Sequence, residues 1–187
     1  MQKNTTLTLV EGALMIALAT ILSFIKLFEM PMGGSITLEM IPLIILALRH
    51  GPKVGCFTGF VHGLLQMIIG FGNVLYCQTL PAQIGCILLD YLLAFTALGL
   101  AGLFAGLLAK HKVFACVSGA FLAGVLRFIC SFLSGVLIWG SYAPEDMPVA
   151  LYSFLYNGAY MLPDVIIVCV VVAILAKSAP ILFKTMD

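Results

Sequence analysis

Long apolar runs, separated by short segments rich in polar residues, glycine or proline, follow one another along almost the whole chain. Runs of about 20 apolar residues are typical of helices that cross the hydrocarbon core of a bilayer. The runs predict six membrane-spanning helices, over residues 6–28, 37–49, 53–70, 83–108, 113–140 and 149–176. The second run is short, and the turn Arg49-His50-Gly51-Pro52 joins it tightly to the third.

The composition agrees with an all-α integral membrane protein. Hydrophobic residues make up 63% of the chain and charged residues 9%, whereas water-soluble domains have about 45–50% apolar and about 25% charged residues. Six spans use up nearly all of the 187 residues, so we expect a single six-helix membrane domain over residues 1–187. The opening MQKNTTLTLVEG has no small-residue cleavage site after a short apolar core, so the first helix is expected to remain.

The distribution of basic residues predicts the orientation of the helices in the membrane. Lysine and arginine near helix ends are retained on the cytoplasmic face. In the six-helix arrangement, one side of the membrane receives Lys3, Arg49, Lys53, Lys110, Lys112, Lys177 and Lys184. The opposite loops carry Glu29, Glu145 and Asp146, with only Lys26 near that edge. Both termini are therefore predicted to be cytoplasmic, and a net charge of +1 gives no reason to expect nucleic acid as a partner.

Three polar residues are predicted to lie at the same depth in the membrane. Asp90, Ser131 and Asn157 each lie about eight or nine residues from the outer ends of their helices. At 1.5 Å per residue this is about 12–14 Å below the outer surface, so the three can line one pocket. Trp139 shares a helix face with Ser131, and Tyr152 opens the last helix near the membrane surface.

Asp90 is the strongest candidate for ligand binding. No basic residue is predicted at its depth in the outer half, so the carboxylate needs either water or a cationic ligand. Tyr91 and Trp139 offer aromatic faces that attract positive charge, and the Asn157 amide suits the edge of a heterocycle. A positively charged heterocycle is therefore the expected ligand. Trp139 also fits an interfacial aromatic belt, and Asn157 also fits a hydrogen bond between helices.

Two further charges are predicted near the bilayer midplane. Arg127 and Asp164 lie at similar depths, and a buried ion pair between helices would satisfy both of them. We interpret this pair as structural, with a proton or ion relay as the alternative. The six cysteines are scattered without a CxxC motif or a nearby histidine pair, so neither a metal site nor a cofactor is expected.

Three segments resemble a known family. They are MPMGGSITLEMIPLIILALRHGPKVG (30–55), LLDYLLAF (88–95) and RFICSFLSGVLIWGSYAPEDMPVALYSFLYNGAYMLP (127–163). They resemble the thiamine-specific substrate-binding subunit, or S component, of bacterial energy-coupling factor transporters. The resemblance implies six helices that enclose thiamine near the extracellular face of the bacterial cell membrane. It also implies two kinds of partner, a membrane scaffold subunit and two cytosolic ATPases.

The resemblance also implies roles for particular residues. Asp90 would face the thiazolium charge with Tyr91 beside it, and Asn157 would bind the pyrimidine. The remaining substrate-binding positions are Ser131, Trp139 and Tyr152. Some members of the family have glutamate in place of Asp90, histidine in place of Ser131 and a tryptophan in the first outer loop, which is absent from residues 30–34 here.

Small residues on the first helix are a second feature shared with that family. Its members use such residues to contact the scaffold, and Ala13-x-x-x-Ala17 matches this pattern. Small residues at this spacing let two helices approach closely, whether within one chain or between two chains. Ala13 and Ala17 are therefore expected to form a docking face.

Three other classes of protein share some of these features. An S component for another vitamin or heterocyclic cation would share most of these features, and a stand-alone channel or carrier would be expected to show inverted repeats. An intramembrane enzyme is disfavoured because GCFTG (55–59) has threonine where a serine nucleophile would stand, and HExxH is absent. The chain also lacks GxxxxGK[ST], so energy for transport would have to come from partners or gradients.

Overall fold

The computed structural model describes residues 5–31, 33–108 and 111–183, most of which are helical. The longer helices are α1 (Thr5–Ser23), α2 (Met40–His50), α3 (Pro52–Ile69), α7 (Ala101–Leu108), α8 (Lys112–Leu137) and α9 (Val149–Ser178). The shorter ones are α4 (Phe71–Leu75), α5 (Leu80–Cys86), the π-helix η1 (Ile87–Leu93), α6 (Ala94–Leu98) and the 3₁₀ helices η2 (Gly140–Tyr142) and η3 (Pro180–Phe183). Two short strands, β1 (Phe28–Glu29) and β2 (Ser35–Ile36), pair antiparallel between α1 and α2.

The helices follow the predicted apolar runs closely, apart from shifts of a few residues at their ends and two larger differences. Helix α1 ends at Ser23 instead of residue 28, because the chain turns there into the β1–β2 hairpin. The predicted span 83–108 is broken by a turn at Gly99 and Leu100, between α6 and α7. Of the described helices, four are long and apolar enough to cross a membrane: Thr5–Ser23, Leu80–Leu98, Lys112–Leu137 and Val149–Ser178. The count of six spans stays a prediction.

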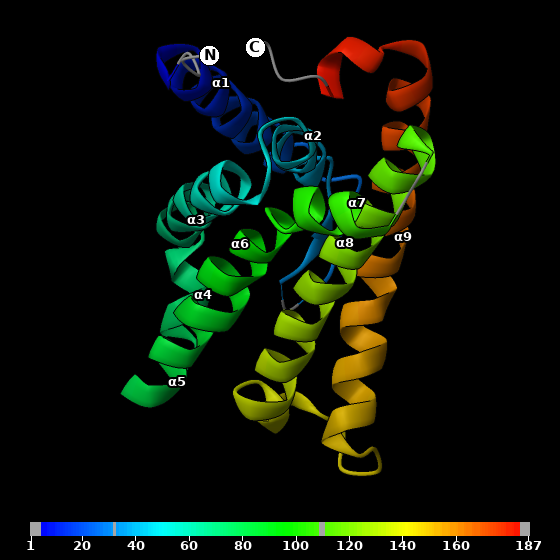
Figure 1. Cartoon of the computed structure of the whole chain (residues 1–187). Coiled ribbons are helices and arrows are strands. Elements are labelled where there is room, and N and C mark those ends of the chain that lie inside the picture. Colours follow the sequence, from blue (N-terminus) through cyan, green and yellow to red (C-terminus); the bar gives the residue numbers. More distant parts are fainter. Residues whose placement is uncertain (1–4, 32, 109–110, 184–187) are drawn as a thin grey trace.

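The beginning of α1 and η3 lie at the same end of the molecule, opposite α5 and the connection between α8 and α9 (Figure 1). The helix ends on the side of η3 and the beginning of α1 carry Arg49, Lys53, Lys112 and Lys177. The other basic residues predicted for this side, Lys3, Lys110 and Lys184, lie outside the described residues. This arrangement is compatible with a common side for both termini, and their cytoplasmic location stays a prediction.

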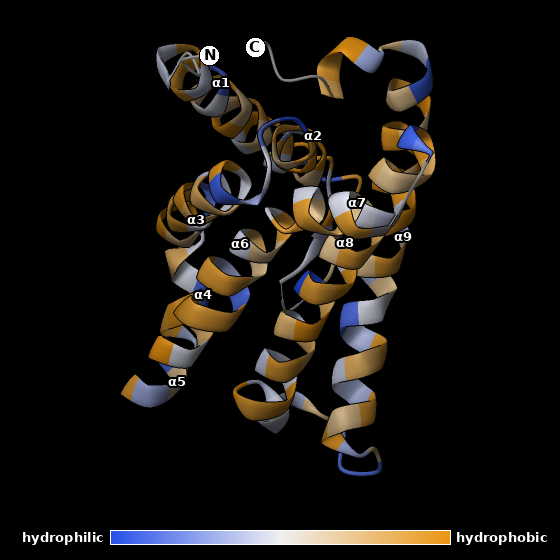
Figure 2. Ribbon diagram, in the orientation of Figure 1, coloured by the Kyte–Doolittle hydropathy of each residue, from blue (hydrophilic) through white to orange (hydrophobic). Residues whose placement is uncertain are grey.

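The outer surface of the helix bundle is apolar. Figure 2 shows hydrophobic residues along all the long helices, and large side chains such as Leu14, Phe57, Leu137 and Leu162 are exposed. Water-soluble monomers rarely expose apolar surface on this scale, whereas lipid solvates it without cost. The described structure is therefore that of a multi-pass α-helical membrane protein.

Glycines permit the closest helix contacts. A side chain at Gly59 would collide with the backbone at Phe95, and one at Gly99 would collide with the backbone at Gly55 and Cys56. Helices α3 and α6 therefore approach at backbone distance, as small residues commonly allow in membranes. This close contact holds the π-helix η1, which directly precedes α6, against α3.

The predicted ion pair between Arg127 and Asp164 is wrong. Arg127 Nη2 instead donates to Glu39 Oε1 at 2.9 Å, and Glu39 Oε2 lies 3.5 Å from Nε2 of the buried His62. Asp164 Oδ1 accepts the backbone N–H of Thr37 at 2.9 Å. The reason is that α2 begins only at Met40, so the segment preceding it enters the bundle and buries Glu39 at 6% exposure.

A second charged cluster joins α1, α2 and η3. The Arg49 guanidinium donates to both carboxylate oxygens of Glu11 at 2.9 Å, and His50 also contacts this carboxylate. Arg49 Nη1 donates to the carbonyl of Ile181 at 3.0 Å. Bidentate arginine–carboxylate pairs fix geometry well, so this cluster orients α1 relative to α2.

The corrected ion pair predicts the relative stability of two variants. Glu39→Ala would leave the Arg127 charge buried without its partner and should lower the free energy of unfolding by about 3–5 kcal/mol. Asp164→Ala removes one acceptor of a backbone N–H and should cost about 1–3 kcal/mol. Thermal and denaturant unfolding in detergent micelles would measure both.

The control is Glu29→Ala, which removes only the exposed ion pair with Lys26 and should change stability by less than about 1 kcal/mol. A larger loss from Asp164→Ala than from Glu39→Ala would contradict the assignment of Glu39 as the partner of Arg127.

Candidate ligand-binding site

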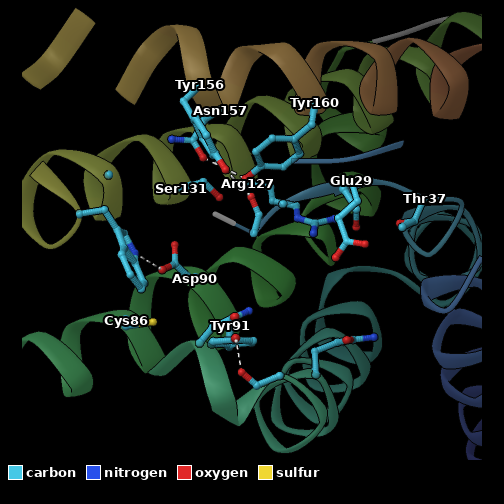
Figure 3. Close-up of a pocket in the computed structure, with 18 of the residues that line it drawn as sticks. Glu29, Thr37, Cys86, Asp90, Tyr91, Arg127, Ser131, Tyr156, Asn157 and Tyr160 are labelled. Carbon is cyan, nitrogen blue, oxygen red and sulfur yellow. Dashed lines mark hydrogen bonds between the residues drawn. The ribbon is translucent and has the colours of Figure 1, made fainter. Parts of the chain in front are cut away.

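A cavity of about 370 Å³ lies between η1, α8, α9 and the β1–β2 hairpin (Figure 3). Its size falls in the range of about 300–1,000 Å³ that is usual for small-molecule sites. All six predicted substrate-binding residues line it: Asp90, Tyr91, Ser131, Trp139, Tyr152 and Asn157. The structure thus brings together side chains from three separate helical segments, and their role in binding stays a prediction.

Asp90 lies on one wall of the cavity, in the π-helix η1. One carboxylate oxygen, Oδ2, accepts hydrogen bonds from Ser134 Oγ at 2.6 Å and from Trp139 Nε1 at 3.1 Å. The Trp139 ring also lies near Tyr142, with 5.8 Å between ring centroids. A carboxylate held in place beside aromatic faces suits a positively charged group. π-Helical turns of this kind are frequent at functional sites.

Asn157 lies on the opposite wall, in α9, and belongs to a chain of hydrogen bonds. Its Nδ2 donates to the carbonyl of Ser153 at 2.9 Å, and its Oδ1 accepts from Tyr160 Oη at 2.9 Å. Ser153 Oγ in turn donates to the carbonyl of Phe132 on α8 at 2.8 Å. These bonds fix the amide plane, and the second lone pair of Oδ1 leaves capacity for a further bond.

The other predicted residues complete the walls. Tyr91 Oη donates to the carbonyl of Gly70 at 3.1 Å, which fixes its ring at the α3–α4 junction. Tyr152 lies beside Tyr156, with 5.7 Å between ring centroids. Ser131 is buried in α8 at 8% exposure. Of the two residues predicted as an ion pair, Arg127 and Asp164, only Arg127 belongs to the described residues that line the cavity.

The β1–β2 hairpin forms part of the cavity wall, which was not predicted from the sequence. Gly33 and Gly34 adopt φ angles of 94° and 89°, a region that favours glycine. A Cβ at Gly34 would lie 2.6 Å from the Tyr160 ring, so only glycine lets the hairpin approach α9. Tyr156 Oη donates to the Gly33 carbonyl at 3.0 Å and holds the hairpin there. The adjacent glycines were the available signal for this turn.

Several other lining residues were also missed. Thr37 and Glu39 were taken as parts of the second helix, and Cys86 was given no role in binding, yet all three line the cavity. Ala13 and Ala17 are exposed on α1, while Gly12 of the same helix packs against Thr58. Within the described ranges no three His, Cys, Asp or Glu side chains are grouped as a metal site would require.

These features define the class: a multi-pass α-helical membrane protein that contains a ligand-sized cavity with polar and aromatic walls. The family model described as "Thiamine transporter protein" matches residues 9–184. The chain therefore belongs to the thiamine transporter protein family, whose members are transport proteins and not enzymes.

Individual relatives agree with the family assignment. A protein named thiamine transporter ThiT from Bacillus subtilis (strain 168) is 38% identical over 194 residues, which cover 98% of this chain and 97% of the relative. Thiamine transporter ThiT from Lacticaseibacillus paracasei is 34% identical, with 100% and 94% coverage. A solved structure of ThiT from Listeria monocytogenes superimposes with a TM-score of 0.79 at 31% identity, covering 96% of this chain and 98% of that one. The shared membrane fold therefore extends over nearly the whole chain.

Proposed function

We propose that the chain is the thiamine-binding membrane subunit of an energy-coupling factor transporter, with its cavity near the extracellular face. The observation that carries the proposal is the position of the Asp90 carboxyl group in the cavity wall. Two basic side chains, Lys26 and Arg127, belong to the described cavity lining, and each is already paired with a glutamate. Asp90 has hydrogen-bond donors but neither of these cations beside it, so a cationic ligand would balance its charge.

Thiamine has the chemistry that this cavity would bind. Its thiazolium ring carries a positive charge that Asp90 and the Trp139 ring would attract, with Tyr91 beside them. Its aminopyrimidine offers donors and acceptors that Asn157 would bind, with Ser131 and Tyr152 on the same side of the cavity. An enclosed site with these contacts would give high affinity, since little polar surface would remain without a partner. The names of the relatives support the same ligand.

The proposed topology has six spans with both termini in the cytoplasm. The six spans would be α1, α2, α3 together with α4, the segment from α5 to α7, α8 and α9. The helix ends on the side of η3 and the beginning of α1 carry Arg49, Lys53, Lys112 and Lys177, and Glu145 and Asp146 lie on the opposite side. This asymmetry is the one that positive residues produce when they are retained in the cytoplasm.

Partners would supply the energy for transport. The sequence has no phosphate-binding loop of the GxxxxGK[ST] type, so two cytosolic ATPases acting through a membrane scaffold subunit are proposed. Ala13 and Ala17 would form the docking face on α1, because both are exposed and small enough for a second helix to approach closely. The cluster of Glu11, Arg49 and His50 would keep this face correctly oriented.

The remaining alternative is an S component for another vitamin or heterocyclic cation. Calorimetric titration of the purified protein with thiamine, riboflavin and biotin separates these functions. We expect tight binding of thiamine alone. Vesicles containing only this chain should bind thiamine without accumulating it when ATP is added. Preferential binding of riboflavin or biotin would assign the chain to a different vitamin, and accumulation by the lone chain would rule out the need for partners.

The role of Asp90 can be tested by removing its charge alone. Asp90→Asn preserves the shape of the side chain and should raise the dissociation constant for thiamine about ten- to hundredfold, as expected for a lost charge-assisted contact. Glu29→Gln is the matched control, since Glu29 lines the cavity but is paired with Lys26. An analogue with a neutral ring in place of the thiazolium should show little further loss in Asp90→Asn. Simple addition of the two losses would mean that Asp90 does not contact the cation.

The docking face can be tested by steric exclusion. Replacing both Ala13 and Ala17 with tryptophan should abolish uptake by the complete transporter while thiamine binding by the isolated subunit is retained. Leu162→Trp with Ile166→Trp is the control, because these residues are exposed at the same spacing on α9. Co-purification of the α1 variant with a scaffold subunit and ATPases at wild-type yield would argue against docking through Ala13 and Ala17.

A further inference from the structure

Ser134 contacts the Asp90 carboxylate from behind the cavity wall. It lies near the C-terminal end of α8 and is 0% exposed. Its hydroxyl donates to Asp90 Oδ2 at 2.6 Å, within the range of about 2.5–2.7 Å that is usual for a hydroxyl donating to a carboxylate. Ser134 is not among the described residues that line the cavity. It can therefore influence a bound ligand only through its neighbours, of which Asp90 accepts its hydrogen bond.

The direction of this hydrogen bond is not explained by the local geometry of α8. Hydroxyl groups within helices commonly donate to the carbonyl four residues earlier in the same helix. Three hydroxyl groups of this chain do so: those of Thr20, Ser118 and Ser178. A serine hydroxyl has a single proton, and Ser134 donates it to Asp90 on another segment. The bond therefore serves the carboxylate and not the helix that carries the serine.

A second donor reaches the same carboxylate oxygen and is tied to Ser134. Trp139 Nε1 donates to Asp90 Oδ2 at 3.1 Å. The backbone N–H of Trp139 donates to the carbonyl of Ser134 at 3.3 Å. Both donors to Oδ2 therefore belong to one short segment at the end of α8, whose parts are bonded to each other.

The two bonds leave the other carboxylate oxygen of Asp90 for the cavity. Figure 3 shows this oxygen, Oδ1, pointing into the space between Asp90 and Ser131, and both of these residues line the cavity. Because Oδ2 is held by two donors, rotation of the carboxylate is restricted and Oδ1 keeps one direction. A group that is already held in its binding geometry loses less conformational freedom when a ligand arrives.

We propose that Ser134 is a positioning residue, which directs Asp90 Oδ1 toward the positive charge of the ligand and thereby favours a cationic ring over a neutral one. This inference rests on the proposed function, in which Asp90 faces the thiazolium ring of thiamine. It adds a residue outside the cavity to the determinants of specificity. The attraction between Oδ1 and a cation depends on their separation, so a carboxylate that turns freely would attract the cation less.

Ser134→Ala removes the hydroxyl and keeps the backbone carbonyl that Trp139 bonds. It should weaken thiamine binding about five- to tenfold in calorimetric titration. Ser134→Thr keeps a hydroxyl and should recover most of this affinity. Ser118→Ala is the matched control on the same helix, because the Ser118 hydroxyl donates to the carbonyl of Phe114, and it should bind thiamine like the wild type.

A neutral ligand separates positioning from a general structural role. An analogue with an uncharged ring in place of the thiazolium should bind Ser134→Ala and the wild type with equal affinity, because the orientation of the carboxylate matters only for the charged ring. Ser134→Ala should likewise cost little further thiamine affinity when it is added to Asp90→Asn, since both changes act on the same contact.

The outcomes distinguish this inference from the proposed function. Thiamine binding by Ser134→Ala at wild-type affinity would overturn the positioning role, and so would an equal loss for thiamine and the neutral analogue. Either result leaves the proposed function intact. If Ser134→Thr fails to fold, the comparison of the two ligands in Ser134→Ala decides alone. A wild-type protein that binds no thiamine would overturn the proposed function, and this inference with it.

Discussion

The buried ion pair between Arg127 and Glu39 is the constraint on which the site depends. It joins the middle of α8 to the residue that precedes α2, and Glu39 also lies within 3.5 Å of His62 on α3. Two buried charges are stable only if each balances the other. The pair, with the contact to His62, therefore holds α2, α3 and α8 at fixed positions around the cavity. Because Arg127 is paired with Glu39, it is not the partner of the Asp90 carboxylate in the cavity wall.

The lipid outside the bundle and the cavity inside it favour different kinds of backbone structure. Lipid on the outside accepts exposed leucine and phenylalanine but no unpaired backbone group, so the described chain is helical almost throughout. The cavity instead needs polar groups and irregular backbone. The β1–β2 hairpin and the π-helix η1 provide both, and each contributes residues to the cavity lining. Irregular backbone at membrane depth is tolerated in such positions.

Contacts between distant segments hold these irregular elements in place. The hairpin is bonded to α9 through Tyr156 and Gly33, and Thr37 is bonded to Asp164. The π-helix is held through Asp90 to Ser134 and Trp139 on and after α8. A ligand between η1, α8 and α9 would contact all three segments. Because the hairpin is hydrogen-bonded to α9, a shift of α9 on binding would also move the hairpin.

The sequence by itself determined most of the helices and the apolar exterior, and from a common depth it predicted one pocket for Asp90, Ser131 and Asn157, which do line one cavity. This was possible because bilayer thickness and the helix rise convert residue counts directly into depth. Only the tertiary structure decided that Arg127 pairs with Glu39, that Asp164 accepts from Thr37 and that Gly34 lets a hairpin approach Tyr160. The depth of a residue does not specify the direction in which its side chain points around the helix axis. The partners in these contacts are also separated by more than 80 residues in the sequence. Only the packing of the whole bundle therefore brings them together.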